Sequence, residues 1–223
     1  ALDLAVGDRP SSLEPSLSLV CAERAWISIP GKVASVSGYE SAASVSGVRD
    51  VFPRAVPGER VVFPRNNVEK CGNCLAVADN REDACHAAEE AARRVFIRLA
   101  AHDSETDVFL MNGNSTPRER TGNPPSAFDV DMNPLDAAPT DYSSLQVGPD
   151  EIPVPSALLP LLDASRDWQG RTLRESISSA LAAEPGLAAC LRAAGATDAI
   201  HYWKALLRGG IQGIVYVYDC QRS

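Results

Sequence analysis

Apolar residues in the first hundred positions occur in short runs of strand length, several of them alternating with polar residues. Pro-Gly pairs at residues 30–31 and 57–58 separate some of these runs, and such pairs are typical of turns. The pattern predicts strands at residues 17–29, 33–36, 48–52, 61–63 and 75–78, with a short helix at residues 39–45.

A longer run with helical periodicity follows the last of these strands. Asn80 is a typical helix N-cap, and alanines recur at positions that share one side of a helix. Glutamates and arginines occupy the opposite side. The spacing predicts one amphipathic helix over residues 82–99, packed on a small antiparallel sheet.

The second half of the chain has a different character. Residues 107–155 contain few apolar residues and several Asn-Pro, Pro-Pro and Gly-Pro pairs, which indicate a linker or an ordered excursion. Helical spacing then returns, and it predicts helices at residues 158–162, 173–183, 187–194 and 199–207. We expect an Arg-Gly-Gly sequence at residues 208–210 to end the last helix.

Residues 211–218 form a nearly continuous apolar run of strand length. Such a run suits a strand covered on both faces, and the sequence therefore predicts a terminal strand that joins or packs on the first sheet. The expected fold class is α+β, with a sheet-and-helix lobe at residues 1–106, an Asn/Pro-rich segment at 107–155, and a helical appendage with a terminal strand at 156–223.

Charge and hydropathy exclude some classes of protein. The net charge of −8 is unfavourable for general binding to nucleic acid. No apolar run approaches the roughly 20 residues of a membrane helix, and the first residues lack the basic start of a secretory signal. We therefore expect a cytoplasmic protein with reduced cysteines and no nucleic-acid or membrane partner.

Five ordered motifs in the first lobe carry a resemblance to a known family. They are P-G-K-V at 30–33, G-V-x-x-V at 47–51, P-G-x-x-V at 57–61, C-G-N-C-L-A-V-A-D at 71–79 and N-x-E-x-A-x-x-A-A-E-x-A at 80–91. In this order they resemble the C-terminal subdomain of ATP-grasp carboxylate–amine ligases of the biotin-carboxylase-like branch, over residues 1–99. Residues 107–223 show no comparable resemblance.

The resemblance implies a function for the intact protein. Such enzymes use ATP and Mg²⁺ to phosphorylate a carboxylate, and an amine then attacks the acyl phosphate. The chain contains neither the glycine-rich phosphate loop nor the E-x-N-x-R metal strand of the family. We therefore expect a C-terminal fragment that binds no ATP or metal by itself and needs N-terminal ATP-grasp domains, and residues 1–7 suggest the end of a truncated helix.

A second interpretation is a non-catalytic interaction or assembly module. The expected partners of the enzyme are small carboxylate and amine substrates, and a homodimer is among the expected assembly states. The upstream reading frame separates the two interpretations. An additional stretch of roughly 200 residues with a glycine-rich loop indicates an enzyme fragment, whereas a start codon at Ala1 indicates a module.

The resemblance also suggests site residues. Arg24 occupies the place of a strand arginine that faces the active site in biotin carboxylases, where it could stabilise acyl phosphate oxygens; the alternative is a structural ion pair. Arg65, Asn66 and Asn67 lie in a loop that faces the catalytic cleft in relatives, which makes them candidate substrate-binding residues.

Other chemical motifs have simpler interpretations. The C-x-x-C of Cys71 and Cys74 could be structural, redox-active or half of a zinc site, with Cys85 and His86 as the nearest further ligands. We favour structural cysteines and predict no metal. A D-x-D at residues 129–131 fits an acidic turn better than a Mg²⁺ site, and the three scattered histidines show no catalytic spacing.

Overall fold

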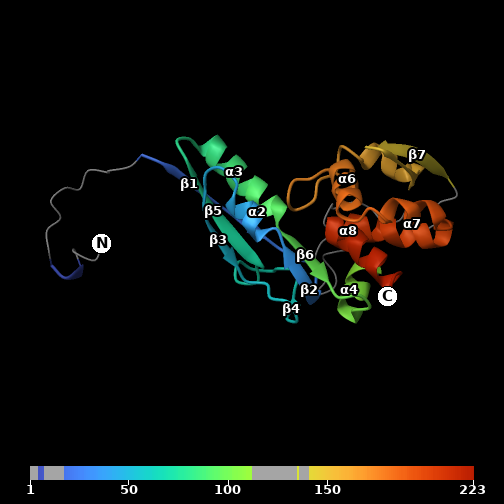
Figure 1. Cartoon of the computed structure of the whole chain (residues 1–223), viewed down its shortest axis with the longest axis horizontal. Helices are drawn as coiled ribbons and strands as arrows, with labels where there is room; N and C mark the ends of the chain where they lie inside the picture. Colours follow the sequence, from blue (N-terminus) through green and yellow to red (C-terminus); the bar gives the residue numbers. More distant parts are fainter. Residues whose placement is uncertain (1–4, 8–17, 112–134, 136–140) are drawn as a thin grey trace.

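Antiparallel strands form the first part of the molecule. The computed structural model describes residues 5–7, 18–111, 135 and 141–223. Within these residues, one three-stranded sheet has the order β1 (Val20–Trp26), β5 (Gly72–Ala78), β3 (Val48–Pro53), and another has the order β4 (Arg60–Val61), β2 (Gly31–Ser37), β6 (Phe96–Leu99). The α+β class is confirmed, with two small sheets in place of the single sheet that we predicted (Figure 1).

A helix rich in alanine covers the first sheet. Helix α3 (Arg81–Arg94) starts at Asn80, whose side chain accepts a hydrogen bond from the backbone N–H of Asp83 at 2.9 Å. Its small buried side chains allow close approach to the strands, and the sulfur of Cys74 lies 3.3 Å from the carbonyl oxygen of Ala88. A short helix, α2 (Tyr39–Ala43), packs beside α3.

The long helix ends earlier than we predicted. It stops at Arg94, and the residues that we assigned to its last turn form β6, which pairs with β2. Val95, Ile97 and Leu99 are buried, as a strand that alternates between its two faces requires. The prediction of helix over residues 95–99 was wrong because pairing with β2 outweighs the helical spacing.

The second part of the described chain is mainly helical. It contains α4 (Ser104–Met111), a hairpin of β7 (Tyr142–Val147) and β8 (Asp150–Pro155), the 3₁₀ helix η1 (Ser156–Leu161), and α6 (Leu173–Ala183), α7 (Leu187–Ala193) and α8 (Ala196–Cys220). The predictions for 173–183 and 187–194 are confirmed within one residue. The hairpin was not predicted, although the Gly148-Pro149 turn between its strands is visible in the sequence.

The predicted terminal strand at residues 211–218 is wrong, because these residues belong to α8. Their apolar run is continuous because the helix is buried almost all around: Ile214, Val215 and Tyr216 are at most 2% exposed. A short apolar run does not distinguish a buried helix from a buried strand. The expected helix stop is partly present, since Gly210 adopts a non-helical conformation (φ 56°, ψ −141°) that kinks α8.

Helix α8 nevertheless lies against the first part of the chain, as we expected of the terminal segment. The buried side chain of Gln212 donates hydrogen bonds to the Ile97 carbonyl (2.8 Å) and the Ser28 hydroxyl (2.9 Å), and it accepts one from the Ile29 N–H (3.2 Å). These bonds join α8 to β6 and to the segment after β1. The two parts of the chain therefore share a core.

Some predictions cannot be compared with the structure. The helix at residues 1–7 and the acidic turn at 129–131 lie wholly or mostly outside the described residues. The division of the chain at residues 106 and 155 stays a prediction. No helix among the described residues has the length and apolar character that crossing a membrane requires.

Candidate functional site

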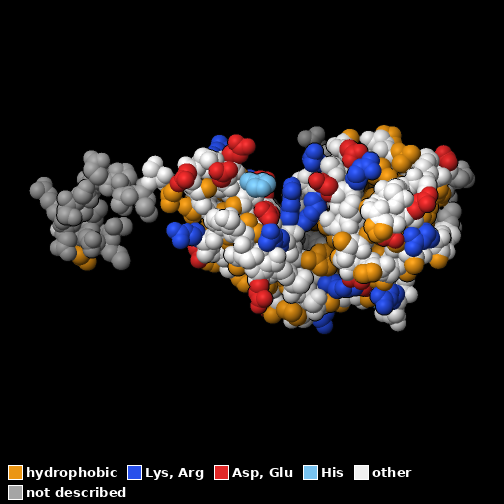
Figure 2. Space-filling view, turned by 45° about the horizontal axis from the view of Figure 1, so that its top comes forward, with side chains coloured by type: hydrophobic (Ala, Val, Ile, Leu, Met, Phe, Trp, Pro, Cys, Tyr) orange, Lys and Arg blue, Asp and Glu red, His pale blue; other side chains and the backbone are white. Residues whose placement is uncertain are grey.

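A groove separates the first sheet and α3 from the C-terminal helices. Figure 2 shows basic side chains gathered in the hollow between the two parts. The groove contains two adjoining cavities of about 210 and 170 Å³ that share Arg93, Trp168 and Gln169. β1, α3, β6, the loop before α6, α6 itself and the kink of α8 supply the walls.

The loop before α6 has a conformation set by Asp167. Its carboxylate oxygen Oδ1 accepts hydrogen bonds from the backbone N–H groups of Gln169 (2.8 Å) and Arg171 (2.9 Å). Gly170 turns the chain with a φ of 74°, which residues with side chains rarely adopt. Thr172 then begins α6 with a capping box. These contacts fix where Trp168 and Arg171 leave the backbone.

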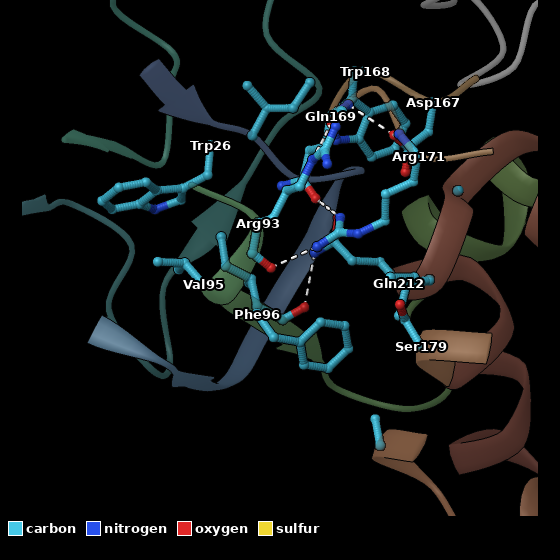
Figure 3. Close-up of a pocket in the computed structure, with 15 residues that line it drawn as sticks. Trp26, Arg93, Val95, Phe96, Asp167, Trp168, Gln169, Arg171, Ser179 and Gln212 are labelled. Carbon is cyan, nitrogen blue, oxygen red and sulfur yellow. Dashed lines mark hydrogen bonds between the residues drawn. The ribbon is translucent and has the colours of Figure 1, made fainter. Parts of the chain in front are cut away.

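Two arginines connect this loop to the end of α3. The Nε of Arg93 donates to the carbonyl of Gln169 at 2.8 Å, and the Nη2 of Arg171 donates to the carbonyl of Arg93 at 2.5 Å. Figure 3 shows Arg171 extending toward Arg93. A guanidinium at this position also complements the negative end of the α3 dipole, so the pair holds the two walls of the groove together.

The groove has an excess of positive charge. Burial lowers the pKa of Arg171, because an arginine removed from water is less favourable in its charged form. Burial likewise raises the pKa of Asp167, and its hydrogen bonds to the backbone N–H groups oppose that shift. The ion pairs of the described residues include neither Arg93 nor Arg171.

Aromatic side chains form part of the wall. Trp168 meets Phe63 edge to face, with ring centroids 5.5 Å apart, and Phe63 stacks on Phe109 at 5.7 Å. Phe96 and the buried Val95 line the larger cavity below Arg171 in the view of Figure 3. The cavity thus combines cationic donors with an apolar surface.

Arg24 lies at the smaller cavity. It projects from β1 toward α3, where its Nη2 forms an ion pair with Glu89 at 2.8 Å. The hydrogen bond to Glu89 raises the pKa of Arg24. The ion pair that we considered as the alternative is therefore present. Both side chains are more than 40% exposed, so the guanidinium stays accessible from the groove. A catalytic role for Arg24 stays a prediction.

The other predicted site residues lie elsewhere. Asn66 accepts a hydrogen bond from the N–H of Val68 at 2.9 Å, and the N–H of Arg65 donates to Glu69 at 2.7 Å. These contacts shape the turn before β5. Neither cavity of the groove includes Arg65, Asn66 or Asn67. The structure therefore does not bring them into one site with Arg24, and their binding role stays a prediction.

The C-x-x-C cysteines lie in the core. Cys71 is 3% exposed and Cys74 is fully buried, and each of the six cysteines carries a free thiol. Burial raises the pKa of Cys71 to about 11, the opposite of the shift that activates a redox thiol. No group of three His, Cys, Asp or Glu side chains in the described part of the chain could hold a metal ion. These observations favour structural cysteines.

The sequence patterns did not indicate the central residues of the groove. Arg93 was assigned to the solvated face of a helix, and Trp168, Arg171 and Gln212 had no predicted role. The D-W-Q-G-R sequence at residues 167–171 was an available signal, because Asp and Gly at this spacing are typical of a tight turn. What the sequence could not provide was the position of that turn beside α3.

Comparison with known proteins gives one result. Residues 25–100 match the family model described as L-amino acid ligase C-terminal domain 2. No curated protein and no solved structure matches the chain. The matched stretch starts one residue after Arg24, includes Arg93 and ends before Trp168 and Arg171. Residues 25–100 are therefore similar to the C-terminal domain 2 of L-amino acid ligases, which fits the C-terminal lobe of an ATP-grasp-like ligase.

Proposed function

We propose that this chain supplies the C-terminal part of an ATP-dependent carboxylate–amine ligase that joins amino acids. The match of residues 25–100 to the C-terminal domain of L-amino acid ligases carries the proposal. The groove supports it, because an accessible arginine on β1 stands beside a second basic cavity. The ATP-grasp domains that complete such an enzyme are its proposed partners.

In the proposed reaction, a substrate carboxylate oxygen takes the γ-phosphoryl group of ATP and ADP leaves. The amine of the second substrate then attacks the acyl carbon, and the C–O bond to phosphate breaks. The amine nitrogen loses a proton and inorganic phosphate departs. Negative charge gathers on the acyl and phosphate oxygens, and Arg24 is positioned to donate hydrogen bonds to them.

No group of three His, Cys, Asp or Glu side chains that could hold a metal ion occurs among the described residues. We therefore assign ATP and metal binding to the proposed partner domains. In this proposal, the chain contributes Arg24 to the reaction site and forms one of its sides. Glu89 positions Arg24, because it accepts two hydrogen bonds from the guanidinium, at 3.2 and 2.8 Å.

The test starts from the full reading frame that contains this sequence. The encoded protein is incubated with ATP, Mg²⁺ and pairs of amino acids, while phosphate release and dipeptide mass are recorded. We expect phosphate release that requires amino acids and matches the dipeptide formed. Amino acids that stimulate no phosphate release across the panel would contradict the proposal.

A further inference from the structure

The larger cavity contains two arginines whose charges no ion pair neutralises. Arg93 uses its Nε–H on the Gln169 carbonyl, and Arg171 uses its Nη groups on the Arg93 carbonyl and the Gln169 side chain. A guanidinium has five N–H donors. Both therefore keep donors that no hydrogen bond among the described residues uses; Arg171 is partly buried, and Arg93 is exposed at the mouth of the cavity.

The charge in this cavity suits a monoanion. The charged residues that line it are Arg93, Arg171 and the buried Asp167. Asp167 does not neutralise either arginine by direct contact, because its Oδ1 accepts from two backbone N–H groups and it forms no ion pair with them. Two guanidinium groups and one carboxylate leave one net positive charge, which a single carboxylate would balance.

The size and remaining walls suit an organic tail. The volume of about 210 Å³ exceeds that of an apolar cavity of about 150 Å³ that binds benzene. Trp168, Phe96, Val95 and Ile211 provide apolar surface next to the arginines. The polar atoms of Gln212 already form hydrogen bonds with Ser28, Ile29 and Ile97, so a ligand does not have to supply hydrogen bonds to them.

We propose that this cavity binds a small organic acid, with its carboxylate toward Arg93 and Arg171 and its apolar tail toward Trp168 and Phe96. Paired N–H donors match the two oxygens of a carboxylate. The site goes beyond the proposed ligase function, because Trp168 and Arg171 lie outside the matched residues 25–100. Binding needs neither ATP nor turnover, so the two proposals can fail separately.

Titration of the purified chain with a homologous series tests the proposal. Acetate, propionate and butyrate are compared with neutral butyramide and with inorganic phosphate, at constant ionic strength, by calorimetry and by the chemical shift of the Trp168 indole N–H. We expect about fourfold tighter binding for each added methylene. Butyramide should bind at least tenfold more weakly than butyrate, and phosphate more weakly than butyrate.

Matched variants assign the binding to the cavity. Arg93→Met should weaken butyrate at least tenfold, and Arg93→Lys should weaken it less because it keeps the charge. Arg94→Met is the control, because Arg94 is the next residue of α3 and pairs with Glu90 outside the cavity. If the Trp168 indole N–H signal of the unmodified protein does not shift during the butyrate titration, that result alone overturns the proposal. Equal binding of butyrate and butyramide, tighter binding of phosphate, or equal effects of the two methionine variants would also overturn it.

Discussion

The guanidinium of Arg98, on β6, holds the carboxylate of Asp219, near the end of α8, through hydrogen bonds of 2.7 and 2.5 Å. The same guanidinium forms an ion pair with Glu184 at 2.6 Å. Arg98 and Asp219 lie 121 positions apart in the sequence. This contact and the bonds of Gln212 join the ligase-like lobe to the C-terminal helices, and they keep the groove between them in one shape.

The substitution Arg98→Met should destabilise the protein by roughly 2 kcal/mol. It leaves Asp219 and Glu184 unpaired, and their side chains are only 18% and 13% exposed. Urea unfolding measures the change. The control is Arg192→Met, which removes a surface ion pair with Asp150 at 3.5 Å and an exposed hydrogen bond to the carbonyl of Glu151 at 3.0 Å, and should cost less than about 1 kcal/mol. Equal losses in the two variants would show that the Arg98 contact is no stronger than a surface pair.

The substitution Gln212→Leu should also destabilise the protein, by roughly 2–4 kcal/mol. The leucine has a similar size, but the buried Ile29 N–H and Ile97 carbonyl lose their partner. Gln146→Leu, at an exposed position of the hairpin, is the control and should have little effect. An unchanged urea midpoint in Gln212→Leu would mean that α8 does not depend on these bonds.

Stability should fall at alkaline pH because of Cys71. Its folded pKa is about 11 against an ordinary value of 9.0. The folded state therefore holds the proton more tightly, so the stabilisation is complete below pH 9 and is lost as the pH rises toward 11, by up to roughly 3 kcal/mol. Unfolding free energies of wild type and Cys71→Ala across this range should converge. If the two proteins instead lose stability in parallel across this range, the raised pKa of Cys71 in the folded state is contradicted.

The chain as given should bind ATP·Mg²⁺ with a Kd no tighter than about 1 mM. The sequence has no phosphate loop, and the described residues offer no metal cluster. Calorimetric titration with ATP and Mg²⁺ measures this directly. A Kd in the low micromolar range would show that ATP binding is not confined to the proposed partner domains.

Local patterns predicted most elements but not the groove. Strands β1, β2, β3 and β5 and helices α6 and α7 follow from spacing and turn residues. Residues 95–99 and 211–218 were assigned to the wrong class, because a short apolar run suits either a buried helix or a buried strand and only distant partners decide. For residues 95–99 the partner is β2, and for 211–218 the partners are the surrounding helices and β6.

The candidate site shows the same limit. Arg24 was proposed because it lies within a strand that the family resemblance covers, and the structure places it at the smaller cavity, while its role stays a prediction. Arg171 could not be predicted, because its significance comes from the approach of the 166–171 loop to the end of α3, 78 residues earlier in the chain. No local sequence pattern indicates a contact between residues that far apart in the chain.

Two substitutions distinguish a catalytic role of Arg24 from a purely structural one. In the full-length protein, Arg24→Met removes the proposed donor to the acyl phosphate, whereas Glu89→Gln removes the partner's charge but keeps an acceptor oxygen that can hold the guanidinium in place. If Arg24 were solely structural, the two variants should behave alike.

The most direct measurement is amino-acid-dependent phosphate release by the full-length protein and these two variants, under saturating ATP. We predict that Arg24→Met lowers kcat by roughly 100-fold or more, as expected for loss of a charge-stabilising donor, while Glu89→Gln lowers it less than about tenfold. Wild-type kcat in Arg24→Met, or equal losses in both variants, would contradict the proposed part of this chain in the ligase reaction.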